Sequence, residues 1–97
     1  MMNQDLLTRV REMEERYDEL TRVLAGLDEA ISEYKTFKPD LQALREYMES
    51  GQWKQDFEAD EAGQIPADVK RGVLSEDGLY DHLQGADKIL SLAKEVL

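Results

Sequence analysis

The side chains best suited to bind a cation are four carboxylates near the middle of the chain, Asp56, Glu58, Asp60 and Glu61. Acidic residues at the first, third and fifth positions of this stretch resemble the opening of an EF-hand calcium loop. The template then fails, because Glu61 stands where the loop needs glycine and Ala67 where it needs a bidentate glutamate. An EF-hand is therefore excluded. A weak divalent-cation site is one alternative for these carboxylates, and solvation or pairing with Lys70 and Arg71 is the other.

The sequence shows no combination of a nucleophile and a base that is typical of an enzyme. His82 is the only histidine and the chain has no cysteine, which excludes thiol nucleophiles and thiolate metal sites. Ser75 is better explained as a helix cap than as a nucleophile, because no base has an evident place beside it. The sequence also contains no glycine-rich phosphate loop and no histidine-rich metal motif. We therefore expect a protein that is not an enzyme and that binds no cofactor.

The net charge of the chain limits the classes of molecule that it is expected to bind. The net charge is -10, from 22 acidic and 12 basic residues. Affinity for nucleic acid depends on neutralising phosphates, and no segregated basic patch is present, so we predict no nucleic-acid partner. No apolar run is long enough for a membrane span, and the first residues lack the features of an export signal. We expect a cytoplasmic protein that does not bind membranes.

The first third of the chain carries an uninterrupted heptad pattern. Its apolar residues recur at alternating intervals of four and three: Leu6, Val10, Met13, Tyr17, Leu20, Leu24, Leu27, Ile31 and Tyr34. This pattern predicts a long helix over about residues 3–37, which buries one narrow face against other helices. A surplus apolar seam on such a helix leaves self-association possible.

Two further helices are indicated by their start and stop signals. Pro39 predicts the end of the first helix, because the residue before a proline avoids the α region. A second helix is expected over about 40–50 and should fold back antiparallel on the first. Ser75 is expected to cap a third helix over about 75–96, with Leu74 and Leu79 as its hydrophobic staple.

An acidic, partly irregular excursion is expected over residues 52–74, between the second and third helices. Within it, Pro66 to Gly72 should form a single helical turn, because proline favours the start of a turn and glycine its end. The fold class is therefore all-α: one domain over residues 1–97, an antiparallel three-helix bundle with a long first helix.

The excursion is also the most distinctive surface of the chain. Apolar residues bracket its acidic part, with Trp53 and Phe57 before it and Ile65 and Val69 after it. This favours a segment anchored at both ends with its carboxylates in water, Trp53 being either a core anchor or part of an exposed patch. The candidate binding surface comprises Trp53, Asp56, Glu58, Asp60, Glu61, Arg71, Glu76 and Asp77.

Residues 47–83 resemble a known family. The resemblance is carried by Tyr47, Ser50, Trp53, Asp56, the Asp60-Glu61-x-Gly63 run, Pro66 and the string from Lys70 to Asp77. Together these are similar to domain-of-unknown-function family 4298, a group of small bacterial proteins. Tyr47-Met48 departs from the paired tyrosines that this family favours. The resemblance implies a bacterial, cytoplasmic setting and no particular activity or site residue.

The leading functional hypothesis is a small non-enzymatic interaction or adaptor protein with an unidentified protein partner. This hypothesis rests on the excursion over residues 52–74, which is the most distinctive segment of an otherwise regular helical chain. Two alternatives come from other classes. One is a protein that binds or is regulated by a divalent metal, and the other is an acidic inhibitor that mimics nucleic acid to occupy a basic partner.

Overall fold

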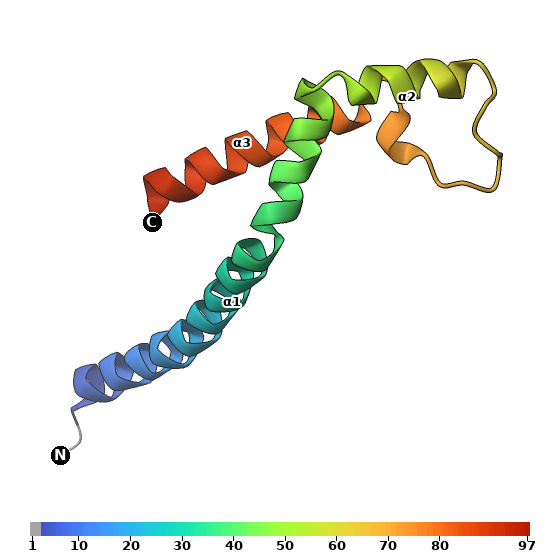
Figure 1. Ribbon diagram of the computed structural model, residues 1–97. Helices are drawn as coiled ribbons and strands as arrows, with labels where there is room; N and C mark the ends of the chain where they lie inside the picture. The colour runs from blue at the N-terminus through green and yellow to red at the C-terminus, as the bar shows by residue number, and fades with distance from the viewer. Residues whose placement is uncertain (1–2) are drawn as a thin grey trace. The chain divides into compact units, whose positions relative to one another are not determined.

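The computed structural model describes residues 3–97, and all regular secondary structure among them is helical, with no strand. Its elements are α1 (Gln4–Glu49), α2 (Gln52–Glu61), the 3-10 helix η1 (Gly72–Leu74) and α3 (Gly78–Val96) (Figure 1). The all-α class and the long first helix are confirmed. Contacts within the chain define two compact units, Met1–Lys38 and Pro39–Leu97, which are described separately below.

The predicted break at Pro39 is wrong, because α1 continues through this proline to Glu49. An interior proline removes one backbone hydrogen bond and costs about 3 kcal/mol. Strong helix formers on both sides, such as Lys35, Leu41 and Ala43, favour propagation of the helix past this local defect. Residues 40–50 therefore extend the first helix instead of folding back on it, and the predicted antiparallel hairpin does not form.

Both ends of α1 follow from local sequence. The Asn3 carboxamide accepts a hydrogen bond from the Leu6 amide at 3.1 Å, which satisfies one of the free N–H groups of the first turn. At the other end, Gly51 has a φ of 86°, a left-handed conformation that glycine adopts without steric cost. The end predicted near residue 50 for the second helix thus coincides with the end of α1.

The first part of the predicted excursion is a helix, so its assignment as irregular was wrong. In α2, Trp53 stacks on Phe57 one turn later, and the Gln52 side chain donates a hydrogen bond to Asp56 at 2.9 Å. Such pairs at a spacing of four residues stabilise a helix. Gly63 then ends α2 at a φ of 74°. Its amide bonds to Asp60 O at 2.9 Å and that of Gln64 to Ala59 O at 3.0 Å, the two bonds of a Schellman motif.

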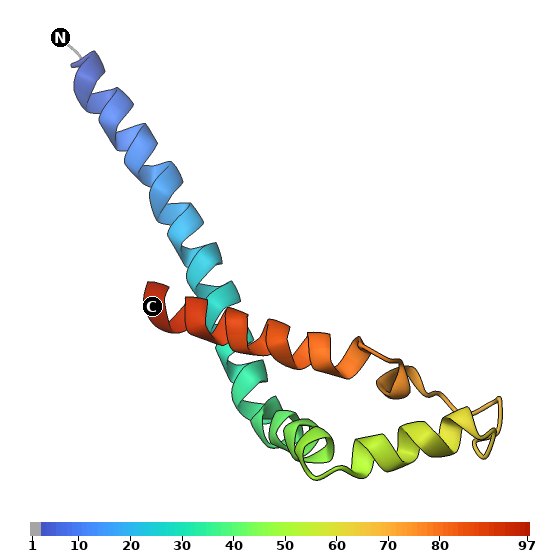
Figure 2. The same ribbon diagram turned by 90° about the horizontal axis from the view of Figure 1, so that it is seen from above.

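The loop after α2 brings the chain back to η1, which contacts both α2 and α3. Figure 2 shows this return from a second direction. Two predictions here need correction. The helical turn predicted over Pro66–Gly72 is wrong, because the Val69 amide closes a turn on Pro66 O at 3.1 Å that covers only Pro66–Val69, and Gly72 begins η1. The third helix begins at Gly78 after Asp77, with no side-chain cap, because Ser75 instead ends η1 through its amide bond to Gly72 O.

The core of the second unit centres on Leu74 and Leu79, which are 7% and 5% exposed. They are the two residues predicted as a hydrophobic staple. Both are buried, but the staple itself is not formed, because α3 begins at Gly78 and Leu79 is its second residue instead of its fourth. Arg45, near the end of α1, pairs with Asp87 of α3 at 2.7 Å. The predicted end of the third helix near Val96 is confirmed. The antiparallel three-helix bundle itself stays a prediction.

Candidate functional site

Trp53 joins α2 to η1. Its indole N–H donates a hydrogen bond to the Val73 carbonyl oxygen at 2.8 Å. Its ring stacks on Phe57 with 5.1 Å between the ring centroids and 17° between the planes. The side chain is half-buried. It therefore anchors the second unit and still presents part of its ring to solvent, which combines the two roles that the sequence left open.

Asp56 joins α2 to the end of α1. The Tyr47 hydroxyl donates to Asp56 Oδ2 at 2.5 Å, and the Gln52 side-chain amide donates to Oδ1 at 2.9 Å. Both carboxylate oxygens are thus engaged within the chain. Because Gly51 lies between Tyr47 and Asp56, these bonds fix the angle at which α2 leaves α1.

The bond between Tyr47 and Asp56 leads to a testable pH dependence. Burial, together with the hydrogen bond to Asp56 and the charge of that carboxylate, raises the pKa of Tyr47 to about 12. A pKa raised above the ordinary value of 10.0 means that neutral Tyr47 stabilises the fold below about pH 10. We expect this stabilisation to be lost as the pH rises from about 10 to about 12.

Urea unfolding across that pH range checks the prediction, with tyrosinate absorbance recorded in parallel. Tyr47→Phe is the control, because it keeps the ring and removes the titrating hydroxyl. The variant should start less stable and lose less stability with pH than the wild type. Parallel losses in the two proteins would contradict the assignment.

Asp60 and Arg71 close the loop between α2 and η1. Arg71 Nη1 lies 2.9 Å from Asp60 Oδ1 and donates a second hydrogen bond to the Ile65 carbonyl oxygen at 3.3 Å. Arg71 is exposed and Asp60 half-buried, so the ion pair adds only about 0–1 kcal/mol of stability. Its main effect is geometric, because it ties the end of α2 to the segment that leads into η1.

The other four predicted surface residues, Glu58, Glu61, Glu76 and Asp77, are exposed. Within residues 3–97, no group of three or more acidic or histidine side chains is arranged to hold a metal ion. The eight predicted residues therefore divide into two sets. Trp53, Asp56, Asp60 and Arg71 hold the second unit together, and the four exposed carboxylates are available to a partner.

Two of those exposed carboxylates line a hollow beside Trp53. We call it the acid-rimmed hollow; its volume is about 570 Å³ and its lining is Met48, Glu49, Gly51, Trp53, Lys54, Phe57, Glu58 and Glu76. Met48, Trp53 and Phe57 supply apolar and aromatic surface, while three carboxylates and one ammonium group supply charge. Sequence reasoning placed Trp53, Glu58 and Glu76 in the binding surface but missed Met48 and Glu49. The continuous α1 brings these two residues to the start of α2.

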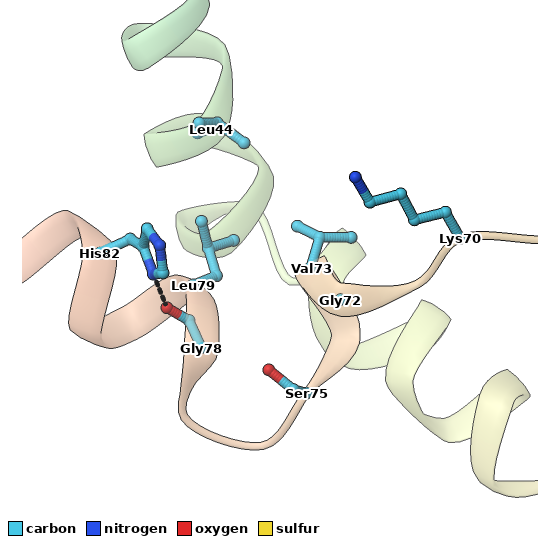
Figure 3. Close-up of a pocket in the computed structure, with 8 residues that line it drawn as sticks. All are labelled: Leu44, Lys70, Gly72, Val73, Ser75, Gly78, Leu79 and His82. Atoms are coloured by element: carbon cyan, nitrogen blue, oxygen red, sulfur yellow. Dashed lines mark hydrogen bonds between the residues drawn. The ribbon is translucent and has the colours of Figure 1, made fainter.

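A second hollow, of about 530 Å³, lies between the end of α1, η1 and the start of α3, and Figure 3 shows its lining. Leu44, Val73 and Leu79 make it mainly apolar. His82 Nδ1–H donates a hydrogen bond to the Gly78 carbonyl oxygen at 2.7 Å (Figure 3). No hydrogen bond joins Ser75 to His82, which both lie in the described part of the chain.

A family model described as "Domain of unknown function (DUF4298)" matches residues 10–95 of the 97-residue chain. The chain belongs to this family. The resemblance found in the sequence is thereby confirmed, and the match extends beyond residues 47–83 into both flanking helices. In this member of DUF4298, Tyr47, Trp53, Asp56, Asp60 and Arg71 are residues that bond α2 to its neighbours. The family residues named from the sequence thus include those that fix the shape of the second unit.

No curated protein and no solved structure matches the chain. Within residues 3–97, none of the helices has the length and apolar character needed to cross a bilayer.

Proposed function

We propose that this protein is a small, cytoplasmic, non-enzymatic adaptor that binds a basic segment of a partner protein in the acid-rimmed hollow. The observation that carries the proposal is the lining of that hollow, which combines three carboxylates with the aromatic rings of Trp53 and Phe57. The proposal retains Trp53, Glu58 and Glu76 from the surface predicted by sequence. It leaves the paired Asp56, Asp60 and Arg71 in structural roles.

The chemistry of the lining fits an arginine or lysine side chain. The faces of Trp53 and Phe57 attract a cation through their π systems. Glu49, Glu58 and Glu76 offer charge-assisted hydrogen bonds to its N–H groups. The aliphatic stem of the incoming residue can pack on Met48, since long basic side chains cover apolar surface while keeping their charge in water.

The charge of the whole chain supports the same class of partner. A net charge of -10 speeds the encounter with basic segments and disfavours acidic ones. The metal-binding and nucleic-acid-mimic alternatives have no comparable observation in their favour.

Capture of partners from a bacterial lysate tests the proposal. The test variant is Glu58→Gln/Glu76→Gln, which removes two charges from the hollow. The control is Glu61→Gln/Glu95→Gln, which removes two exposed charges that do not line it. Loss of two charge-assisted contacts should lower retention of the partner by about tenfold in the test variant.

The control variant should retain the partner as the wild type does. Equal retention by all three proteins would remove the hollow as the binding site. Circular dichroism on each variant shows whether the fold is kept, so that a loss of retention is assigned to the surface.

A further inference from the structure

Most apolar residues of the first unit are exposed in its described part, residues 3–38. We call the set Leu6, Val10, Met13, Tyr17, Leu20, Leu24, Leu27, Ile31 and Tyr34 the α1 seam. Tyr34 is half-buried and the other eight are exposed, from 37% for Ile31 to 68% for Tyr17. At about 1.5 Å per residue the seam is roughly 42 Å long. An apolar strip of this length is normally covered by another protein surface.

We infer that the α1 seam pairs with the α1 seam of a second copy, as a parallel, in-register, two-stranded coiled coil. This inference goes beyond the proposed function and does not depend on it. The acid-rimmed hollow is built from residues 48–76, whereas the seam lies in the unit Met1–Lys38.

The α1 seam is complementary in shape to the α1 seam of a second copy. In a parallel in-register pair, each seam residue packs against its own copy, which gives an unbroken series of apolar layers. In the heptad register of the seam, Val10 is at position a and Met13 at position d. Leucine occupies three of the five d positions (Leu6, Leu20, Leu27), and a β-branched residue occupies two of the four a positions (Val10, Ile31). This distribution favours two strands over three or four. The layers end at Lys38, the first charged a position after them.

The second argument is charge. Arg9 lies at a g position and Glu14 at the e position five residues later, and these two positions face each other across a parallel pair. Two symmetric ion pairs between Arg9 and Glu14 therefore form in the dimer. Both side chains are exposed, and neither is paired with another residue of 3–97.

Charge also disfavours one of the antiparallel registers. This register packs Leu20 against Leu24 of the other copy. It then places Glu14 opposite Asp28, twice, by symmetry. Like charges at facing positions are destabilising and suppress that arrangement. The Arg9–Glu14 ion pairs thus favour a second copy as the partner, in the parallel direction.

Sedimentation equilibrium of the full chain tests the pairing. The wild type should be a dimer, and Leu24→Glu should weaken the dimer by more than about 100-fold because two carboxylates would be buried in one apolar layer. Ala25→Glu is the matched control, since it adds the same charge one residue away, at an outward b position. It should remain a dimer.

A mixing experiment tests the direction of the chains. Arg9→Glu places glutamates at both facing positions of its homodimer, and Glu14→Arg places arginines there. Each variant alone should dimerise roughly three- to tenfold more weakly than the wild type. An equimolar mixture restores both ion pairs in the parallel heterodimer, so the mixture should regain the wild-type affinity.

Several results would overturn the inference. These are a monomer at every concentration, a dimer unaffected by Leu24→Glu, a trimer, or a mixture that dimerises no better than its components. The last would show an antiparallel or staggered pair. None of them affects retention of a basic partner by the hollow, so failure here and failure of the proposed function are distinguishable.

Discussion

Replacing Trp53 with alanine is expected to destabilise the second unit by about 3 kcal/mol. The Trp53 side chain is only half-buried, but it makes two contacts that stabilise the second unit. It stacks on Phe57 within α2 and donates a hydrogen bond to Val73 O of η1. Alanine removes the apolar contact and leaves the Val73 carbonyl oxygen without its donor. Chemical denaturation followed by circular dichroism measures the loss, because Trp53 is the only tryptophan and its fluorescence disappears in the variant.

Trp53→Phe separates the two contributions. Phenylalanine keeps an aromatic ring against Phe57 and loses the indole N–H, so we expect a smaller cost of about 1 kcal/mol. If alanine and phenylalanine were equally tolerated, Trp53 would not be the anchor between α2 and η1.

The second large effect is expected at Leu79. This residue is 5% exposed and is one of two buried residues among 3–97, the other being Leu74. Leu79→Ala removes buried methyl groups and leaves a cavity in a small core, which costs about 2–4 kcal/mol. The free energy of unfolding from urea titration is the direct measurement.

Ile89→Ala is the matched control for Leu79→Ala. Ile89 lies on the same helix and is 67% exposed, so its truncation should change the unfolding free energy by less than about 0.5 kcal/mol. A control as destabilising as Leu79→Ala would mean that the outer face of α3 is covered, and the core described here would then be incomplete.

Structural features were predicted correctly from the sequence where a single local pattern of residues determined them. The alternation of four and three from Leu6 to Tyr34 predicted the long first helix, and the end expected for the second helix near residue 50 coincides with the end of α1, next to Gly51. Leu74 and Leu79, expected as apolar anchors at the start of the third helix, are the two buried residues among 3–97, although they do not form the predicted staple. In these cases the physical cause, an apolar periodicity or a left-handed glycine, lies within a few residues of the feature it determines.

Prediction failed where two local signals competed. Pro39 was taken as a helix end, but strong helix formers around it carry α1 past the missing hydrogen bond. The acidity of residues 56–61 was taken as the mark of a loop. Gly63 at the end of a helix and the pairing of Trp53 with Phe57 were the signals that would have indicated α2.

The candidate site was only partly accessible from the sequence. Trp53, Glu58 and Glu76 were identified by residue type, but Met48 and Glu49 join them only because α1 continues to Glu49. Pairing of the acidic cluster with Arg71 was one alternative that the sequence left open, and Asp60 makes that pair, whereas the bond of Asp56 to Tyr47 was missed; the two bonds span 11 and 9 residues. Such pairings depend on the path of the loop after α2, which no local pattern specifies.

The central claim is that the acid-rimmed hollow recognises a basic side chain, and the single Trp53 indole resonance tests it most directly. A short arginine-containing peptide and its glutamate counterpart are titrated against the ¹⁵N-labelled protein. We expect the indole N–H signal to move saturably with the arginine peptide and to stay in place with the glutamate peptide. An indole signal that stays in place with the arginine peptide, or that moves equally with both, would contradict it.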